Sequence, residues 1–445
     1  MQEVLCVTGG RRLEGRVQVS GAKNAALPLL IASLLTEEEC VFENVPNLED
    51  ISVLLRLLRS LGAEFEFHAN RVRLRTPKIR CTEAPYGLVK ALRASFWVLG
   101  PLLARFGEAR VSLPGGDAIG TRPVDIHLEG LSKMGAEVRL DHGVVYATAP
   151  GGLRPADITL DFPSVGATHQ LLMAAALTSG RTVIRGAARE PEIVDVAKFL
   201  SSLGAKIEGA GTAEIEISGC RELGFGSHQV VHRVMGDRIE AATYLAAAAA
   251  TGGKVCVEGI AGEDMASVLE LFEATGSTVL SSCGLVEADE EKEAVSQVVV
   301  SGPAKLEPVS FETAPFPGVA TDVQPMLMAM LTRANGKSVI RETVFENRFG
   351  HVAEYRRFGA DITIDGRVAT ICGVPSLTSA PVEAGDIRAA AGLAIIALLA
   401  EGTTIISEIY HLDRGYDGLV SKLDSLGAKV SRIPALESRE LVFGC

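Results

Sequence analysis

One pattern recurs six times along the chain and restricts the folds it can adopt. Each copy has an apolar helical segment, then a glycine, a small residue and a strand. A helix often ends on a left-handed residue, a conformation that glycine adopts without a Cβ clash. The copies recur roughly 70 to 80 residues apart, which suits a small α/β unit better than a solenoid repeat. They are centred on Gly62, Gly135, Gly204, Gly276, Gly359 and Gly427.

A second apolar helix precedes another strand in these units, as in Ala174–Leu177 before Thr182–Ile184. The longest apolar run, Ala389–Ala400, is too short to span a bilayer and predicts a buried helix. Six units suggest two similar domains of three, with helices inside and sheets outside. The loop-rich stretch Ser218–Ser227 places the divide near residues 220–236. A cleft between such domains is a usual place for a ligand site.

The amino-acid composition indicates a class of protein and disfavours some classes of partner. Hydrophobic residues make up 47% of the 445 residues, which is typical of globular proteins. The net charge of -12 disfavours nucleic acids and acidic membranes as partners, although a local arginine cluster can still bind an anion. The eight cysteines form no metal-ligand spacing and indicate free thiols in a reducing cytoplasm. The N-terminus lacks the pattern of a secretory signal.

Two polar stretches interrupt the repeat and are candidates for function. In Ser20–Ala26, a turn places Lys23 and Asn24 at the mouth of an apolar helix, where an anion is favoured. A helix cap with a solvated lysine is the plainer alternative. The second stretch, Leu113–Asp125, is a glycine-rich loop with two carboxylates and one arginine, and it is long enough to act as a lid.

Arginines also occur at similar places in nearly every repeat. Taken singly, each is explained by a structural salt bridge. Together they predict a central site for polyanions, because the planar guanidinium group matches phosphate and carboxylate. The stretches that contain these arginines are Lys90–Ser95, Asp237–Glu240, Glu346–Arg348, Asp386–Arg388 and His411–Tyr416, and Thr321–Gln324 is a further polar candidate that has an aspartate in place of an arginine.

These motifs, in this order along the chain, resemble the enolpyruvyl transferases of the UDP-N-acetylglucosamine 1-carboxyvinyltransferase family. The resemblance spans essentially the whole chain. The motifs that carry it are Ser20–Ala26, Ala84–Tyr86, Leu113–Asp125, Ala188–Glu192, Asp237–Glu240, Glu342–Arg348 and Tyr410–Tyr416.

The resemblance implies a two-domain inside-out α/β barrel. It implies one domain of residues 23–233, with a mobile loop at about 112–125, and a second of residues 1–22 plus 234–445. It also implies a cytoplasmic enzyme that uses no metal or organic cofactor. Its substrates would be phosphoenolpyruvate and UDP-N-acetylglucosamine. The reaction adds the sugar 3′-hydroxyl to C2 of phosphoenolpyruvate, protonates C3 and expels phosphate, as the first committed step of peptidoglycan precursor synthesis, which supports cell wall growth and division.

The family's site residues carry over position by position. Asp117 would be the general acid and Asp322 the general base. Lys23, Arg122 and Arg414 would also be catalytic, because they would hold the phosphate of phosphoenolpyruvate. Arg348 and Arg388 would bind its carboxylate, and Asn24 would also bind phosphoenolpyruvate. The sugar nucleotide would contact Asn24, Arg93, Pro123, Val124, Asp125, Ile126, Ser164, Val165, Gly166, Asp322 and Val344.

Asp117 departs from the family pattern, in which this position is a cysteine that is the general acid and the target of fosfomycin. An unperturbed aspartate has a pKa of about 3.9, against about 8.5 for cysteine. We therefore expect an active enzyme with a lower pH optimum than a cysteine form. Epoxide alkylation needs a soft thiolate, so we also expect fosfomycin resistance. Phe162 stands where many members have a lysine, which removes one expected nucleotide contact.

Two other functions are alternatives to this interpretation. The sibling enolpyruvyl transferase of the shikimate pathway has a Gly-Asn-Ala-Gly-Thr stretch, which is absent where this chain has Lys90–Ser95. A non-catalytic sugar-nucleotide binder would explain the missing cysteine. Such a binder would not need Asp322 and the arginines for phosphate departure.

Overall fold

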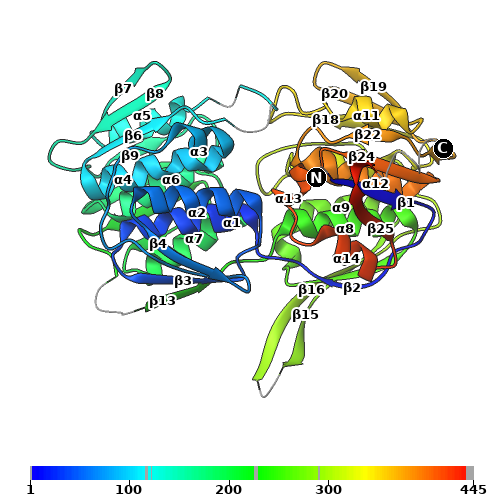
Figure 1. The fold of residues 1–445 in the computed structure, drawn as a ribbon, viewed down its shortest axis with the longest axis horizontal. Helices are drawn as coiled ribbons and strands as arrows, with labels where there is room; N and C mark the ends of the chain where they lie inside the picture. Colours follow the sequence, from blue (N-terminus) through cyan, green and yellow to red (C-terminus); the bar gives the residue numbers. More distant parts are fainter. Residues whose placement is uncertain (1–2, 116–118, 122, 225–228, 289–290, 437–445) are drawn as a thin grey trace. The chain divides into compact units, whose positions relative to one another are not determined.

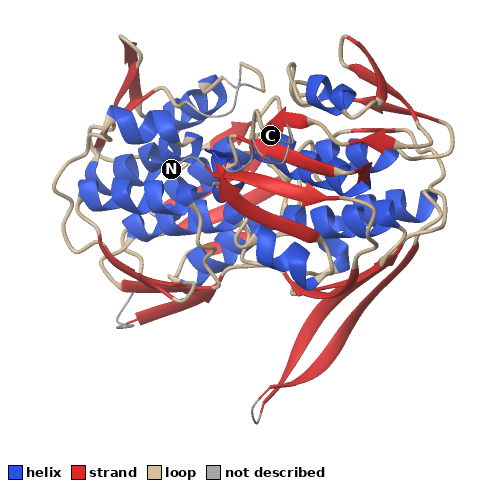
Figure 2. Cartoon of the chain, turned by 45° about the vertical axis from the view of Figure 1, so that its right-hand side comes forward, coloured by secondary structure: helices blue, strands red, loops and turns tan. Residues whose placement is uncertain are grey.

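The computed structural model describes residues 3–115, 119–121, 123–224, 229–288 and 291–436 (Figure 1). The chain divides into two compact units. Unit N comprises Gly21–Asp117 and Arg122–Met235, and unit C comprises Met1–Ser20, Ala118–Thr121 and Gly236–Cys445. In each unit, helices gather inside and strands lie around them (Figure 2).

Unit N has three sheets among its described residues, with strand orders β13-β3-β5-β4, β6-β8-β7 and β11-β12-β10-β9. Most neighbours are antiparallel, but β13 runs parallel to β3, and β10 runs parallel to β9 with Ile184 opposite Ile158. The strands are β3 (Glu39–Glu43), β4 (Glu64–His68), β5 (Arg71–Arg75), β6 (Glu108–Ser112), β7 (Glu137–Asp141), β8 (Val144–Thr148), β9 (Asp157–Thr159), β10 (Gly180–Arg185), β11 (Lys206–Glu208), β12 (Glu214–Gly219) and β13 (Gln229–Arg233).

The helices of unit N differ in how they meet the core. α1 and α6 are buried on nearly every side, whereas α2 buries its leucines and leaves Arg56 and Arg59 exposed. The helices are α1 (Lys23–Ala32), α2 (Glu49–Leu61), α3 (Tyr86–Ala91), α4 (Leu99–Phe106), α5 (Asp125–Lys133), α6 (Val165–Ala176), α7 (Pro191–Ser202) and the 3₁₀ helices η1 (Ser33–Leu35) and η2 (Arg93–Val98).

Unit C has sheets of order β22-β24-β1-β25, β15-β16-β14-β2 and β17-β18-β20-β19 and a small pair, β21-β23. β1 pairs antiparallel with β24 and β25, and β2 pairs parallel with β14, so the start of the chain belongs to this unit. The strands are β1 (Glu3–Thr8), β2 (Glu14–Gln18), β14 (Lys254–Glu258), β15 (Thr278–Ala288), β16 (Glu291–Ser301), β17 (Phe311–Glu312), β18 (Lys337–Arg341), β19 (Asp361–Asp365), β20 (Val368–Cys372), β21 (Leu377–Thr378), β22 (Pro381–Glu383), β23 (Ala400–Glu401), β24 (Thr403–Ser407) and β25 (Lys429–Pro434).

Three apolar helices, α8, α10 and α12, pack against one another at the centre of unit C. All but the last residue of the run Ala389–Ala400 fall in α12, and residues 389–398 are buried, so the predicted buried helix is confirmed. Asp237 and Asp386 cap α8 and α12 by accepting backbone N–H groups. The helices are α8 (Arg238–Thr251), α9 (Ala266–Ala274), α10 (Gln324–Leu331), α11 (Val352–Arg357), α12 (Ile387–Leu399), α13 (Tyr410–Asp413), α14 (Leu419–Ser425) and the 3₁₀ helix η3 (Gly262–Met265).

The six predicted passages from helix through glycine to strand are present in the structure. Each glycine has a positive φ, follows a helix and precedes a strand by one residue. Gly62, for example, has φ 124° between α2 and β4. Three passages lie in unit N and three in unit C, and the glycines are Gly62, Gly135, Gly204, Gly276, Gly359 and Gly427.

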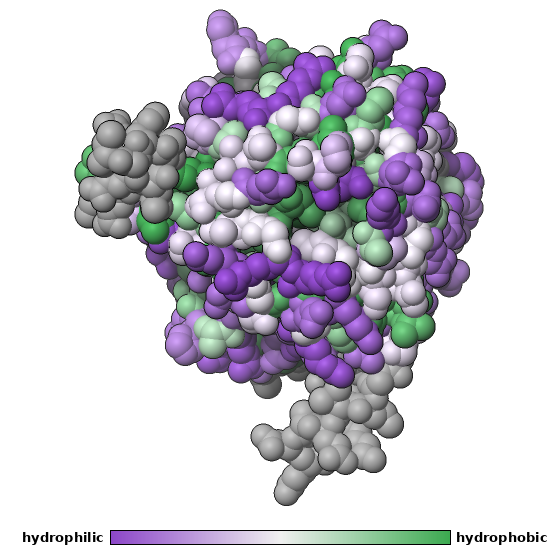
Figure 3. Space-filling model, turned by 90° about the vertical axis from the view of Figure 1, so that its right-hand side faces the viewer, coloured by the Kyte–Doolittle hydropathy of each residue, from purple (hydrophilic) through white to green (hydrophobic). Residues whose placement is uncertain are grey.

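The surface is mixed in character. Hydrophilic residues surround small groups of hydrophobic ones on the face shown in Figure 3. Among the described residues, every helix is too short or too polar to pass through a bilayer. β15 and β16 continue past their pairing with β14, which ends at Glu258 opposite Gln297, and form a projecting two-stranded ribbon (Figure 1).

The buried His169 of α6 leads to a prediction about stability in acid. Its two ring nitrogens have no hydrogen-bond partner among the described residues, and the ring lies tilted against Trp97, with 5.5 Å between the ring centroids. Burial lowers the pKa of His169 to about 3. An unfolded histidine has a pKa of about 6.5, so the unfolded chain binds the proton first as the pH falls. The contribution of His169 to the free energy of unfolding is therefore fully present above a pH of about 6.5 and is lost as the pH falls towards 3.

The His169→Leu variant should lose less stability than the wild type between pH 7.5 and pH 5, by about 2 kcal/mol in the free energy of unfolding. Urea unfolding at the two pH values measures this difference. The exposed His68 provides the control variant His68→Leu. An unchanged pH dependence in His169→Leu would show that another group controls acid stability.

Candidate active site

Lys23 opens α1 and is almost wholly buried, at 8% exposure. Its Nζ lies 3.1 Å from Oδ2 of Asp50, a buried residue in the first turn of α2. A buried ammonium group needs a countercharge, and this pair supplies one. Asn24, the next residue, is half-buried. Lys23 is thus a fixed cation at the start of a helix, where the helix dipole also favours an anion.

Three separate segments of unit N that were predicted to bind the sugar nucleotide lie together. The Arg93 side chain, at the start of η2, donates from Nη2 to the backbone oxygen of Pro123 at 3.4 Å. Asp125 begins α5, and Val124 and Ile126 beside it are half-buried. Helix α5 packs against α6, and η2 also packs against α6.

The start of α6 forms the third segment. Ser164 caps the helix, and its Oγ accepts the backbone N–H of Ala167 at 3.3 Å. Val165 and Gly166 form the first turn and are half-buried. A Cβ at Gly166 would lie 2.7 Å from Nε1 of Trp97, so only glycine lets the turn approach this ring. Phe162 just before it is 42% exposed.

A buried hydrogen bond fixes α5 against α6. Nδ1 of His127 lies 2.6 Å from Oε1 of Gln170. Burial lowers the pKa of His127 to about 4, so the ring is neutral at pH 7. Because Oε1 is only an acceptor, the proton is assigned to Nδ1, which donates. This bond holds the segments that begin at Pro123 and Ser164 in one arrangement.

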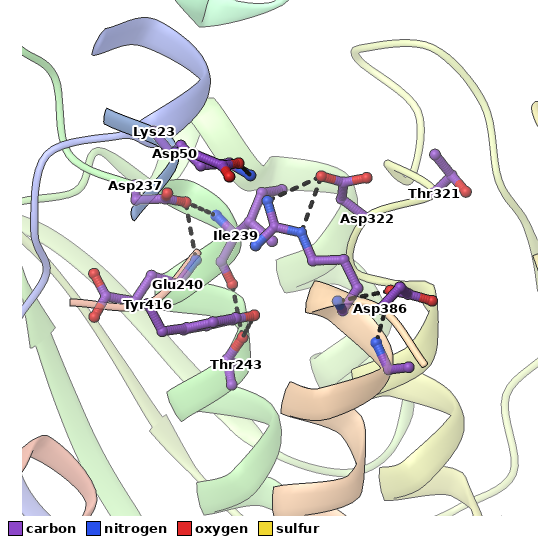
Figure 4. Close-up of polar contacts among 12 residues, drawn as sticks. Lys23, Asp50, Asp237, Ile239, Glu240, Thr243, Thr321, Asp322, Asp386 and Tyr416 are labelled. Atoms are coloured by element: carbon purple, nitrogen blue, oxygen red, sulfur yellow. Dashed lines mark hydrogen bonds and ion pairs between the residues drawn. The ribbon is translucent and has the colours of Figure 1, made fainter. Parts of the chain in front are cut away.

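In unit C, Asp322 is paired with two buried arginines, and Figure 4 shows its contacts with one guanidinium group. Nε and Nη2 of Arg388 both lie 3.0 Å from Oδ2 of Asp322, and Nη2 of Arg348 lies 4.0 Å from Oδ1. The two arginines are 4% and 3% exposed, so their charges are screened little by solvent. Nη1 of Arg388 is buried and has no hydrogen bond of normal geometry among the described residues. That N–H group can serve a carboxylate ligand.

Asp386 completes this arrangement. It caps α12 by accepting the backbone N–H groups of Arg388 at 2.8 Å and Ala389 at 3.0 Å, and its Oδ1 lies 3.3 Å from Nη1 of Arg348. Burial raises the pKa of Asp386, but Arg348 and these N–H groups lower it more, so the net pKa lies below its ordinary value. One carboxylate therefore fixes the start of α12 and one of the arginines.

Val344 is joined to Asp322 through the buried Glu342. The Glu342 carboxylate accepts the backbone N–H of Val344 at 2.9 Å and the hydroxyl of Thr321 at 3.0 Å. Thr321 immediately precedes Asp322. The turn that carries Val344 is therefore tied to the turn that carries Asp322.

Arg414 lies at the end of α13 and is half-buried. Asp117 and Arg122 lie outside the described residues. Between them, Ile119 and Gly120 belong to unit C, where the Ile119 backbone oxygen accepts the N–H of Asn347 at 3.0 Å. The loop expected at about 112–125 is therefore shared between the two units. Among the described residues, no cluster of histidine, cysteine and carboxylate side chains suits a metal ion.

Sequence reasoning assigned no role to three carboxylates that hold the predicted anion-binding side chains in place. Asp50 gave no signal, because a buried carboxylate in a helix looks like a surface residue in sequence. Glu342 and Asp386 lie in the stretches Glu342–Arg348 and Asp386–Arg388 that the sequence singled out. Asp386 had the helix-cap pattern before α12 as a possible signal.

Comparison with known proteins identifies the fold. A family model described as EPSP synthase (3-phosphoshikimate 1-carboxyvinyltransferase) matches residues 7–423. The structure of the enolpyruvyl transferase NikO from Streptomyces tendae matches with a TM-score of 0.83 and 28% identity, over 98% of this chain and 99% of that chain. EPSP synthase from Acinetobacter baumannii matches with a TM-score of 0.75 and 17% identity over 98% and 100%, and it shows the fold alone. The predicted enolpyruvyl transferase fold is confirmed.

Relatives that match over nearly their full length identify the group within the enolpyruvyl transferases to which the chain belongs. A protein of Trichlorobacter lovleyi named UDP-N-acetylglucosamine 1-carboxyvinyltransferase is 48% identical over 96% of this chain and 99% of its own length. A protein of Carboxydothermus hydrogenoformans named UDP-N-acetylglucosamine 1-carboxyvinyltransferase 2 is 48% identical over 97% and 99%. The chain is therefore an enzyme of the enolpyruvyl transferase family, and within it belongs to the UDP-N-acetylglucosamine 1-carboxyvinyltransferases.

Proposed function

We propose that this protein transfers the enolpyruvyl group of phosphoenolpyruvate to the 3′-hydroxyl of UDP-N-acetylglucosamine and releases phosphate. The relatives named for this activity, at 48% identity over nearly the full length, support the choice of acceptor. The observation that carries the chemistry is the carboxylate of Asp322 held between two buried arginines.

The roles of these groups follow from their charges. The ion pair with Arg388 stabilises the ionised form of Asp322, which is the form that can accept a proton. Asp322 takes the proton of the sugar 3′-hydroxyl while the oxygen of that hydroxyl bonds to C2 of phosphoenolpyruvate. Asp117 gives a proton to C3, so the addition produces a tetrahedral intermediate with a methyl group. Loss of a proton from this methyl group and of phosphate from C2 then restores the double bond.

Cations bind the two anionic ends of phosphoenolpyruvate. Arg348 and Arg388 bind its carboxylate, for which Nη1 of Arg388 is a suitable donor. Lys23, Arg122 and Arg414 bind the phosphate and stabilise the charge that builds on it as it leaves. The internal carboxylates Asp50, Asp322 and Asp386 hold Lys23, Arg388 and Arg348 in position.

The sugar nucleotide contacts the segments that begin at Arg93, Pro123 and Ser164, and Val344 and Asp322 are further proposed contacts. The starts of α5 and α6 present backbone N–H groups that suit its diphosphate. Phe162 supplies no charge there. We further propose that the reaction takes place in the cytoplasm and begins peptidoglycan precursor synthesis.

Phosphate release tests the proposed reaction. Wild type should release phosphate from phosphoenolpyruvate only when UDP-N-acetylglucosamine is present, and Asp322→Asn should lower kcat by about 10²–10⁴-fold, because it removes the general base. The matched control is Asp361→Asn, which neutralises an exposed carboxylate of the same unit. Release that is independent of the acceptor, or unchanged in Asp322→Asn, would contradict the proposal.

Asp117 predicts resistance to fosfomycin. Wild type should keep full activity after long incubation with the epoxide, because a carboxylate is a poor substitute for a soft thiolate. Asp117→Cys should lose activity with time, gain one adduct by mass spectrometry, and show a higher pH optimum than wild type. Time-dependent inactivation of wild type with an adduct on Asp117 would refute the prediction, and a pH optimum in Asp117→Cys equal to or below that of wild type would count against Asp117 as the acid.

A further inference from the structure

Tyr416 is a buried aromatic residue beside the arginines of the site that the proposed reaction leaves without a role. It is 3% exposed and follows Arg414 by two positions. Its ring lies under Arg388, with 5.7 Å between the guanidinium carbon and the ring centroid. A cation near the face of an aromatic ring is attracted to it, and more strongly when both are out of water. Tyr416 is thus a second neighbour of Arg388, in addition to Asp322.

The hydroxyl of Tyr416 is fixed by α8 (Figure 4). Its oxygen lies 3.0 Å from Oγ1 of Thr243, and Thr243 in turn donates to the backbone oxygen of Ile239 at 2.9 Å. A threonine hydroxyl has one proton, and this one goes to Ile239. The Tyr416 hydroxyl therefore donates to Thr243, and its lone pairs remain for the guanidinium group. The phenol ring cannot rotate away without breaking this bond.

Electrostatics point to the same contact. Burial lowers the pKa of Arg388, but the negative charges of Asp322 and Asp237 and a hydrogen bond to the Tyr416 hydroxyl outweigh burial and raise it. Burial raises the pKa of Tyr416, so the phenol is neutral at pH 7. A neutral ring with an oriented hydroxyl can hold the arginine without neutralising its charge. The charge stays available for an anion, which an additional carboxylate in this place would not allow.

The backbone brings Tyr416 to this position. The N–H of Tyr416 donates to the oxygen of Leu412 at 2.8 Å, which continues the turn of α13. A Cβ on Gly415 would lie 2.3 Å from Cγ2 of Ile387, the first residue of α12, so only glycine permits this approach. The segment Arg414–Tyr416 is therefore packed directly against the start of the helix that carries Arg388.

We propose that Tyr416 is a positioning residue that holds the Arg388 side chain at a fixed distance from the segment that carries Arg414. This inference rests on the proposed function, in which Arg388 binds the carboxylate and Arg414 the phosphate of one substrate, phosphoenolpyruvate. A small, rigid substrate with an anion at each end is bound well only if its two cationic ligands keep a fixed separation. Tyr416 connects these ligands, through its ring to Arg388 and through two peptide bonds to Arg414.

The test separates the binding of the two substrates. Tyr416→Phe keeps the ring and loses the bond to Thr243, and it should raise the KM for phosphoenolpyruvate about threefold to tenfold. Tyr416→Leu also loses the ring and should raise it about thirtyfold. Thr243→Val should behave like Tyr416→Phe. In all three variants, kcat should change less than this KM, and the KM for UDP-N-acetylglucosamine should stay as in wild type.

The matched control is Tyr244→Phe. Tyr244 is fully buried on the same helix as Thr243, and its hydroxyl donates to Glu240 at 3.0 Å. This variant should lower the melting temperature without changing the KM for phosphoenolpyruvate. If Tyr416→Leu does not fold, Tyr416→Phe and Thr243→Val decide the question.

Two outcomes would overturn the role of Tyr416. One is an unchanged KM for phosphoenolpyruvate in folded Tyr416 variants, and the other is an equal rise in the KM of both substrates, as a purely structural role predicts. A wild type that yields no enolpyruvyl product at all would instead refute the proposed function. The two failures are therefore distinguishable.

Discussion

The arrangement of the site in unit C depends on the ion pairs buried at the start of α12. The two arginines are almost wholly buried, and without countercharges the loss of hydration would strongly destabilise the folded protein. A paired carboxylate offsets this desolvation cost only when the geometry of the ion pair is good. Asp322 and Asp386 provide these charges, and Asp386 also caps the helix. The apolar α12 behind them excludes water and keeps the local dielectric low. The same burial makes the arginines effective ligands for an anion.

Unit N uses similar devices for a different purpose. Lys23 is held by Asp50, and a neutral His127 bonded to Gln170 fixes the starts of α5 and α6. Under the proposed function, the N–H groups at these helix starts bind the diphosphate, and they need no countercharge of their own. Phe162 in place of a lysine is consistent with such a design, because the helix termini remain.

The sequence carried enough information for the fold and for part of the site. The six glycines and the apolar runs predicted the helix ends and the buried helices, because both depend on local conformation and on hydrophobic pattern. The ion pairs between the arginines and aspartates of the site were not predictable in this way. Arg388 and Asp322 are 66 residues apart and Arg348 and Asp386 are 38 apart, and nothing local in either residue specifies its partner. Tyr416 gave no separate signal, because a buried tyrosine after a glycine resembles ordinary core.

The most direct test of the account is the structure of the product formed from phosphoenolpyruvate labelled with carbon-13 at C2 and UDP-N-acetylglucosamine. Nuclear magnetic resonance should show the labelled carbon as an enol ether coupled through oxygen to the proton on C3 of the sugar. This result would establish the group that is transferred and the hydroxyl that receives it. A label recovered only as phosphoenolpyruvate or pyruvate, or attached to a different acceptor position, would contradict the account.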